Sequence, residues 1–107
     1  MIGDEVKVIV DRPMGSRHPN HNETVYPINY GYIDGLIAPD GEEQDAYILG
    51  VNEPVDCFVG EVIAVIRRFD DVEEKWVVAP KGMTFKTDEI RKLTDFQEKY
   101  FHIEIIR

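Results

Sequence analysis

A nearly continuous apolar run between Gly60 and Arg68 constrains the fold more than any other feature of the sequence. An apolar run without polar alternation is typical of a strand that is buried on both faces, as in the interior of a barrel. A second apolar run, from Trp76 to Pro80, follows after a short acidic turn. Two strands that flank a short polar turn indicate a β-hairpin. The middle of the chain therefore predicts buried β-structure.

Other segments are also expected to be strands, because they are rich in β-branched and aromatic residues and are bounded by turn residues. These segments are Val6–Val10, Tyr26–Ile33, Asp45–Val51 and, near the end of the chain, the short run Ile103–Ile106. Pro27 lies at the start of its segment, where the missing N–H group harms a sheet least.

One helix is expected to begin at Thr87-Asp88-Glu89, because Thr87 is a suitable N-cap and the two acids complement the helix dipole. The apolar side of this helix is expected to consist of Ile90, Leu93, Phe96, Tyr100 and Phe101. About five short, mostly antiparallel strands and one C-terminal helix predict a mainly β (α+β) fold. The architecture expected is a small, closed or partly open five-stranded barrel with that helix beside it.

Composition bounds the possible partners. The 107 residues are expected to form one domain, residues 1–107. The formal charge of −9, from 21 acidic and 12 basic residues, argues against nucleic acid and against an anionic membrane as partner. A phosphate substrate is still compatible with this charge, because bound metal ions reverse the local field. The lone Cys57 and the acidic start Met1–Glu5 favour a cytoplasmic protein without an internal disulfide or a signal peptide.

Four carboxylates lie within six residues, at Asp40, Glu42, Glu43 and Asp45. The pair Asp40-Gly41 is a turn signal, so these acids can converge on one point. Their mutual repulsion is relieved when a cation lies between them, and carboxylates with water and substrate phosphate are the usual ligands of Mg²⁺. The alternative is an acidic turn that only faces solvent.

Two motifs together indicate a family. Tyr26-Pro27-Ile28-Asn29-Tyr30-Gly31-Tyr32-Ile33, followed by Asp40-Gly41-Glu42-Glu43-Gln44-Asp45, resembles the soluble family I inorganic pyrophosphatases. Their pattern is Tyr-Pro-x-Asn-Tyr-Gly-aromatic-Ile and then Asp-x-Asp-Pro-x-Asp. The first motif matches throughout, whereas Glu42 replaces the middle Asp and Glu43 replaces the Pro.

The resemblance implies an OB-like barrel and the Mg²⁺-dependent hydrolysis of pyrophosphate to two phosphates. It covers roughly residues 6–101 and assigns roles to individual residues. The implied metal ligands are Asp11, Asp40, Glu42, Asp45, Asp70 and Glu73, with Asp71 as an alternative to Asp70. Glu42 is the implied general base, with Tyr30 and Lys75 as further catalytic residues. Lys75, Tyr100 and Arg17 are expected to bind the phosphates.

The chain departs from the family where cations are expected. Pro19 and Phe101 stand at the positions of two lysines, and most of a hairpin that carries an arginine is missing. Arg17 is the nearest substitute, with Arg12 and His18 behind it. A metal pair formed by His18 and His21 is the weaker interpretation, because no Cys or third His lies near them.

Three alternatives follow from these departures. The first is a hydrolase that acts on another phosphoanhydride, such as a nucleotide. The second is a non-catalytic module that binds metal or phosphate, and the third is a structural OB-like interaction domain. The partners expected are pyrophosphate as a small-molecule substrate and further copies of the chain in a homo-oligomer, without nucleic acid or membrane.

Overall fold

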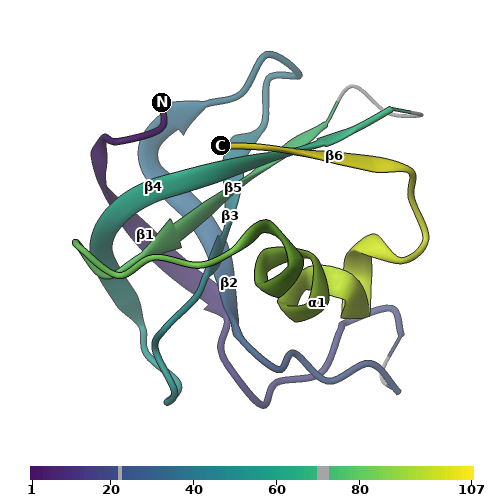
Figure 1. The fold of residues 1–107 in the computed structure, drawn as a ribbon. Coiled ribbons are helices and arrows are strands. Elements are labelled where there is room, and N and C mark those ends of the chain that lie inside the picture. Colours follow the sequence, from purple (N-terminus) through teal and green to yellow (C-terminus); the bar gives the residue numbers. More distant parts are fainter. Residues whose placement is uncertain (22, 70–72) are drawn as a thin grey trace.

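The computed structural model describes residues 1–21, 23–69 and 73–107. Within these ranges, six strands and one helix follow one another in sequence order (Figure 1). They are β1 (Glu5–Arg12), β2 (Asn29–Ile37), β3 (Glu43–Ile48), β4 (Cys57–Arg68), β5 (Glu74–Ala79), α1 (Thr87–Glu98) and β6 (Ile103–Ile106). In these ranges no helix is long and apolar enough to cross a membrane.

Five of the strands close into a barrel. The strand order is β1-β2-β3-β5-β4, and β1 also pairs with β4, so the sheet closes on itself. The pairing of β3 with β5 is parallel, whereas the other pairs are antiparallel. β6 adds to β4 outside this ring. The prediction of a five-stranded barrel with one C-terminal helix is therefore confirmed, with β6 as an additional strand.

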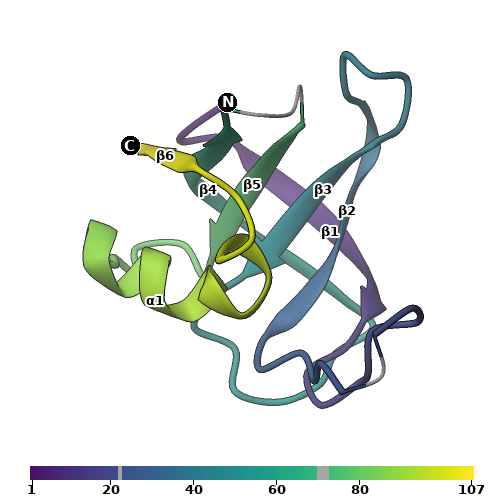
Figure 2. The ribbon, with the colours of Figure 1, turned by 90° about the vertical axis from the view of Figure 1, so that its right-hand side faces the viewer.

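The two faces of the sheet form two separate cores. Along β3 and the residue after it the side chains alternate, so Ala46 and Ile48 point into the barrel while Tyr47 and Leu49 point outward. The outward cluster also contains Ile90 of α1. Figure 2 shows α1 at the side of the barrel, where it covers part of this outer face.

The strand β4 contributes to both cores. Every residue from Gly60 to Ile66 is buried or half-buried, as the apolar run predicts. The register to β5 shifts between Val62 and Ala64. As a result, Val62 lies in the barrel core, whereas Ala64 and Ile66 lie on the helix side. The same side ends with Arg68, which is also buried.

Several element boundaries differ from the sequence expectation. β2 begins at Asn29 rather than Tyr26, because Pro27 has no N–H to donate and the Tyr26 N–H bonds to the carbonyl of Ser16 instead. Thr87 was expected as the N-cap of the helix, but Lys86 occupies that position, and its N–H donates to Glu89 at 2.8 Å. The glutamate at the third helical position therefore satisfies the free N–H group at this end.

The helix also ends earlier than its apolar pattern suggests. Its last residue is Glu98, so Tyr100 and Phe101 lie in the turn that leads to β6. The buried side of α1 is formed by Ile90, Thr94 and Glu98, which lie four residues apart. The expectation that Tyr100 and Phe101 extend the apolar side of the helix was therefore wrong.

Gly31 marks the closest approach of β2 to β1. A Cβ atom at this position would lie 1.9 Å from the carbonyl oxygen of Ile9. Only glycine fits there, so the residue between Tyr30 and Tyr32 is fixed by the way β2 crosses β1.

Candidate functional site

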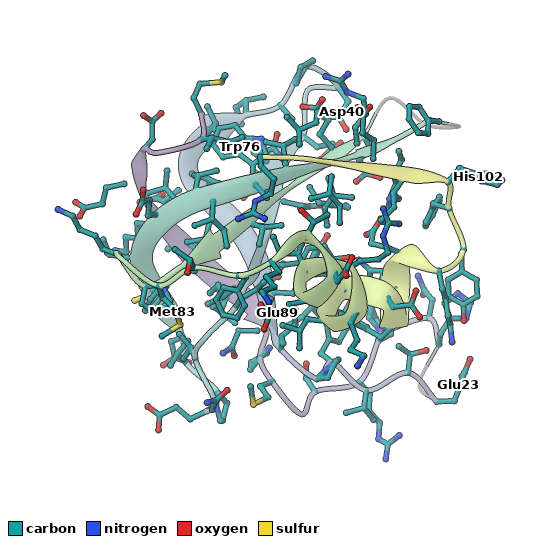
Figure 3. All side chains as sticks on the ribbon, viewed as in Figure 1. Glu23, Asp40, Trp76, Met83, Glu89 and His102 are labelled. Atoms are coloured by element: carbon teal, nitrogen blue, oxygen red, sulfur yellow. The ribbon has the colours of Figure 1, made fainter. Side chains whose placement is uncertain are left out.

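The turn between β2 and β3 carries the acidic cluster. Gly41 has a positive φ of 87°, which glycine adopts readily, and the Ala38 N–H bonds to the Glu42 carbonyl at 2.7 Å. The Asp40 carboxylate accepts the N–H of Glu42 at 3.0 Å and so helps to hold the turn. Figure 3 shows Asp40 at the top of the view, on this turn, far from Glu89 on α1. The turn predicted from Asp40-Gly41 is thus present.

A small cavity of about 160 Å³ opens next to this turn. We call it the acidic cavity, because five carboxylates line it. The lining side chains are Asp40, Glu43, Asp45, Glu73 and Glu74, together with Ala38, Pro39 and Gln44. Three of the predicted metal ligands, Asp40, Asp45 and Glu73, therefore lie around one space. Glu42 is exposed on the same turn and is not one of the residues that line the cavity.

Lys75 joins two of these carboxylates. Its ammonium Nζ donates to Asp45 Oδ2 and to Glu73 Oε1, both at 2.6 Å. The Lys75 side chain is 5% exposed, whereas the two carboxylates are each 32% exposed. A buried ammonium group is stable only when it is paired, so these two acids hold the lysine charge in place.

Tyr30 belongs to the same group of side chains. Its hydroxyl donates to Asp45 Oδ2 at 2.9 Å, and its ring lies 5.6 Å from the Lys75 Nζ. Burial of the ring, followed by the nearby Asp45 charge, raises the pKa of Tyr30 far above the ordinary value of a tyrosine. The hydroxyl therefore stays protonated and acts as a hydrogen-bond donor in this site.

Arg68 extends the chain of ion pairs away from the acidic cavity. Its Nη1 donates to Glu73 Oε2 at 3.2 Å, while Nε and Nη2 donate to the two oxygens of Glu98 at 2.9 and 2.7 Å. Glu98 is only 2% exposed and also accepts the hydroxyl of Tyr47. Burial alone would lower the pKa of Arg68, but the hydrogen bonds and charge of Glu98 raise it, so the guanidinium is always charged.

On the other side of these ion pairs lies a larger cavity of about 700 Å³. We call it the large cavity. It is bounded by cationic and aromatic side chains from β1, β2, β4, β5, the loop before β2, and the end of α1. They include Arg12, Arg68 and Lys75 together with Tyr26, Tyr30, Phe96, Tyr100 and Phe101. Asp45 and Glu73 thus face an acidic space, while the cations bonded to them face a second one.

The structure brings some predicted site residues together and leaves others apart. Asp11 is exposed at the end of β1 and lines the large cavity, as does Tyr100, whose side chain is 70% exposed. Arg17 is exposed and pairs with Val25 in an isolated β-bridge, and it does not appear among the described residues that line either cavity. Asp70 and its alternative Asp71 lie outside the described residues.

Two residues of the site were missed from the sequence. Arg68 lies two residues after Ile66 and four after Ala64, which are both buried on the helix side of β4, so the period of two places it on that side. Glu98 follows Ile90 and Thr94 at helical spacing. Each residue alone is typical of a surface charge. The strand period of two and the helix period of about four together predict that Arg68 and Glu98 form a buried pair between β4 and α1.

The acidic cavity suits a hard divalent cation by the chemistry of its side chains. Mg²⁺ and Ca²⁺ prefer carboxylate oxygens, and this cavity offers five carboxylates. Two of them, Asp45 and Glu73, meet at Lys75 instead. Within residues 1–21, 23–69 and 73–107, no three His, Cys, Asp or Glu side chains are gathered closely enough to hold a metal ion. The carboxylate ligands therefore suit a divalent cation. To surround one, Asp45 and Glu73 have to give up their hydrogen bonds to Lys75.

Comparison with known proteins identifies the family. Residues 3–105 match the family model for inorganic pyrophosphatase. A search of curated proteins finds no match. Since the family model covers almost the whole chain, it includes both the acidic turn and the residues around Lys75.

Solved structures share the fold at low sequence identity. The inorganic pyrophosphatase from Ehrlichia chaffeensis has a TM-score of 0.71 and 18% identity over 97% of this chain and 85% of that chain. The inorganic pyrophosphatase from Neisseria gonorrhoeae has a TM-score of 0.68 and 19% identity over 92% of this chain and 74% of that chain. For the inorganic pyrophosphatase from Thermus thermophilus the values are 0.62 and 15%, over 100% and 85%. At these identities the structures are evidence for the fold alone.

Proposed function

Because this chain belongs to the inorganic pyrophosphatase family, we propose that it hydrolyses inorganic pyrophosphate to two phosphate ions with the help of Mg²⁺. The reaction breaks one phosphoric anhydride bond by the addition of water. The family resemblance read from the Tyr26–Ile33 and Asp40–Asp45 motifs is confirmed by the family match.

One observation carries the proposal: a wall of alternating charges borders both the acidic cavity and the large cavity. The wall runs from Asp45 through Lys75 and Glu73 to Arg68. Its carboxylates line the acidic cavity and its cations line the large cavity. A metal-bound phosphoanhydride needs carboxylates for its metal ion and cationic donors for its phosphate oxygens, and these four side chains supply both kinds of group next to one another.

We assign the metal to Asp40, Asp45 and Glu73, with Asp11 and Asp70 as further ligands in this proposal. A divalent cation held by these carboxylates supplies Lewis acidity, which makes a water more acidic and neutralises the phosphate charge. Glu42 is our candidate for the base that takes the proton from water. It lies on the acidic turn beside Asp40 and Glu43, both of which line the acidic cavity.

The residues of the large cavity would bind the phosphates. Lys75 supplies a buried positive charge, and the Tyr30 hydroxyl supplies a donor that stays protonated. Tyr100 contributes a second phenol at the rim of the cavity. Arg17, which is exposed in the loop before β2, stays in this proposal as a further phosphate-binding residue. Charge-assisted hydrogen bonds of this kind are the strong ones in phosphate recognition.

The first test is phosphate release from pyrophosphate by the purified chain at millimolar Mg²⁺, with excess chelator as the control. Asp45→Asn is expected to lower kcat by at least ~100-fold, since loss of a residue that merely supports a metal ligand already costs 10–100-fold. Asp56→Asn is the matched control, because Asp56 is exposed in the loop before β4 and lines neither cavity. Equal activity of the two variants would remove Asp45 from the site, and a wild-type chain without phosphate release would refute the function.

A second candidate substrate is a phosphoanhydride that carries an organic group, such as a nucleoside diphosphate or triphosphate. The volume of the large cavity favours it, because about 700 Å³ exceeds what pyrophosphate requires. The exposed aromatic ring of Tyr100 lines that space and can stack on a base. Rates of phosphate release from pyrophosphate, ADP and ATP under the same conditions decide between the two substrates.

The cellular location and the assembly stay predictions. We propose a cytoplasmic protein that forms a homo-oligomer, as the sequence analysis expects. Light scattering of the purified chain after size-exclusion chromatography measures the assembly, and a monomeric mass at micromolar concentration would contradict it.

A further inference from the structure

Arg68 is a cation of the site to which neither the sequence motifs nor the family assignment gives a role. It is the last residue of β4, and its side chain is 5% exposed. It nevertheless lines the large cavity, on the same wall as Lys75 and Tyr30. A buried arginine in a cavity wall is a costly feature unless its charge is fully paired.

The pairing of Arg68 leaves part of its guanidinium for a ligand. Nε and Nη2 donate side-on to Glu98, and Nη1 donates to Glu73. The planar guanidinium has more N–H groups than these three bonds to described residues use. Glu98 is buried and does not line the large cavity, so it anchors the guanidinium without occupying the space in which a ligand would bind.

Phe101 fixes the orientation of the guanidinium plane. The Arg68 Cζ lies 3.7 Å from the centre of the Phe101 ring, which is a cation–π contact. The same ring lines the large cavity. A guanidinium that is held by an aromatic face and by a carboxylate has little rotational freedom left to lose when it binds an anion.

We propose that Arg68 is a substrate-binding residue of this site and that its guanidinium fork binds phosphate oxygens in the large cavity, next to Lys75. The inference rests on the proposed function, because it assumes a phosphoanhydride in that cavity. An arginine fork matches the geometry of phosphate oxygens and donates two parallel hydrogen bonds to them. Lys75 offers a point charge, so the two cations complement each other.

The test has to separate binding from stability, because removal of Arg68 alone leaves Glu98 buried without its partner. We therefore choose the double variant Arg68→Met/Glu98→Gln, which removes both charges and keeps similar side-chain volumes. Glu98→Gln alone is the matched control, because it keeps Arg68 and an oxygen acceptor for it. Melting temperatures of both variants show whether they fold.

Two readouts follow the substrate. The KM for pyrophosphate is expected to rise about tenfold or more in Arg68→Met/Glu98→Gln, the size of one lost charge-assisted hydrogen bond. In Glu98→Gln, which keeps the guanidinium and changes only its anchor, the KM is expected to rise less than in the double variant, and the difference between the two variants is the contribution of Arg68. Calorimetry with methylenediphosphonate, which resembles pyrophosphate but has no bond to hydrolyse, is expected to show the same tenfold loss of affinity.

Arg68→Lys is the second variant, should the double variant not fold. It retains a cation for Glu98 but replaces the fork by a point charge, so the affinity for methylenediphosphonate is expected to fall severalfold. Wild-type affinity for methylenediphosphonate in each folded variant would overturn the inference. If the wild-type chain binds methylenediphosphonate and releases no phosphate from pyrophosphate, the proposed function fails while the role of Arg68 is still measured by the calorimetry.

Discussion

At the scale of single residues, the site is a continuous network of hydrogen bonds and ion pairs in which each polar side chain binds the next one. Tyr47 and Glu98 continue this chain under α1, where Gln97 donates to the Tyr47 hydroxyl at 2.8 Å. Among the described residues, no buried side-chain nitrogen or oxygen lacks a hydrogen-bond partner. Such fully satisfied networks are rigid, and partly satisfied ones destabilise a protein. Substitutions here are therefore expected to affect stability as well as binding.

The first prediction concerns Tyr47. Burial, reinforced by the Glu98 charge, raises the pKa of Tyr47 well above its ordinary value of 10.0. In the unfolded chain the phenol ionises near pH 10, whereas in the folded chain it keeps its proton. Its contribution to stability is therefore fully present below about pH 10 and is lost as the pH rises further toward the folded pKa.

Tyr47→Phe removes this alkaline dependence. Above about pH 10, the free energy of unfolding of the variant is expected to fall less steeply, by about 1.4 kcal/mol per pH unit for one proton. Urea unfolding of both proteins at several pH values between 9 and about 11 measures the two slopes. Parallel slopes would contradict the prediction, and Tyr100→Phe controls for the removal of an exposed hydroxyl.

The acidic turn and the residues around Lys75 were accessible to sequence reasoning, because their residue types follow the order of the family's motifs. Asp40, Asp45, Glu73, Lys75 and Tyr30 were all expected in one site, and the structure places them around one wall. The pairing of Arg68 with Glu98 was not expected, because the family motifs give neither residue a role and each charge alone is typical of a protein surface. Only the docking of α1 on the barrel brings these two charges together.

At the scale of elements, the connection between α1 and β6 has a second role besides linking them. The Phe101 N–H bonds to the Glu98 carbonyl at 3.0 Å, which ends the helix and places the Phe101 ring under Arg68. β6 then pairs with β4 from Arg68 toward Val65. The connection between α1 and β6 thus ends the helix, positions the added strand β6 on β4 and holds the Arg68 side chain in place.

Phe101→Leu tests this connection. The variant keeps an apolar side chain but loses the ring beneath Arg68, so stability is expected to fall by about 0.5–2 kcal/mol, the range of a cation–π contact. For a chain of this size, 1 kcal/mol corresponds to about 4–8 °C in Tm. Thermal unfolding measures the difference, with Tyr100→Leu as the control because the Tyr100 side chain is 70% exposed. A Tm equal to that of the wild type would show that the ring does not hold the arginine.

Strand existence was predicted better than strand limits. The apolar run of β4 and the β-branched run of β1 identified their elements correctly, because burial on a sheet requires such residues. The start of β2 was placed too early, since the backbone of Tyr26 pairs with Ser16 in the preceding loop. That pairing is a tertiary contact and leaves no periodic signal in the sequence.

At the scale of the whole molecule, the barrel organises the site by bringing three strands of the outer face into contact. Asp45 on β3, Lys75 on β5 and Arg68 on β4 come from neighbouring strands in the order of the sheet. The parallel pairing of β3 with β5 sets two of these residues side by side. The barrel was predicted from the number of strands and the apolar run, whereas the position of β6 on its outside was not.

The closure of the barrel has a consequence for the speed of folding. Residues 5–9 of β1 pair with residues 57–61 of β4, so the ring closes only after the intervening chain has found its place. Closing so large a loop costs entropy before any contact across it is gained. Chains dominated by such distant pairings fold in about milliseconds to seconds, more slowly than helical proteins of the same length. Stopped-flow refolding is expected to fall in this range, and a main phase in microseconds would mean that the barrel closes early. Since the site needs β3, β4 and β5 in register, pyrophosphate binding during refolding is expected to appear with that slow phase and not before it.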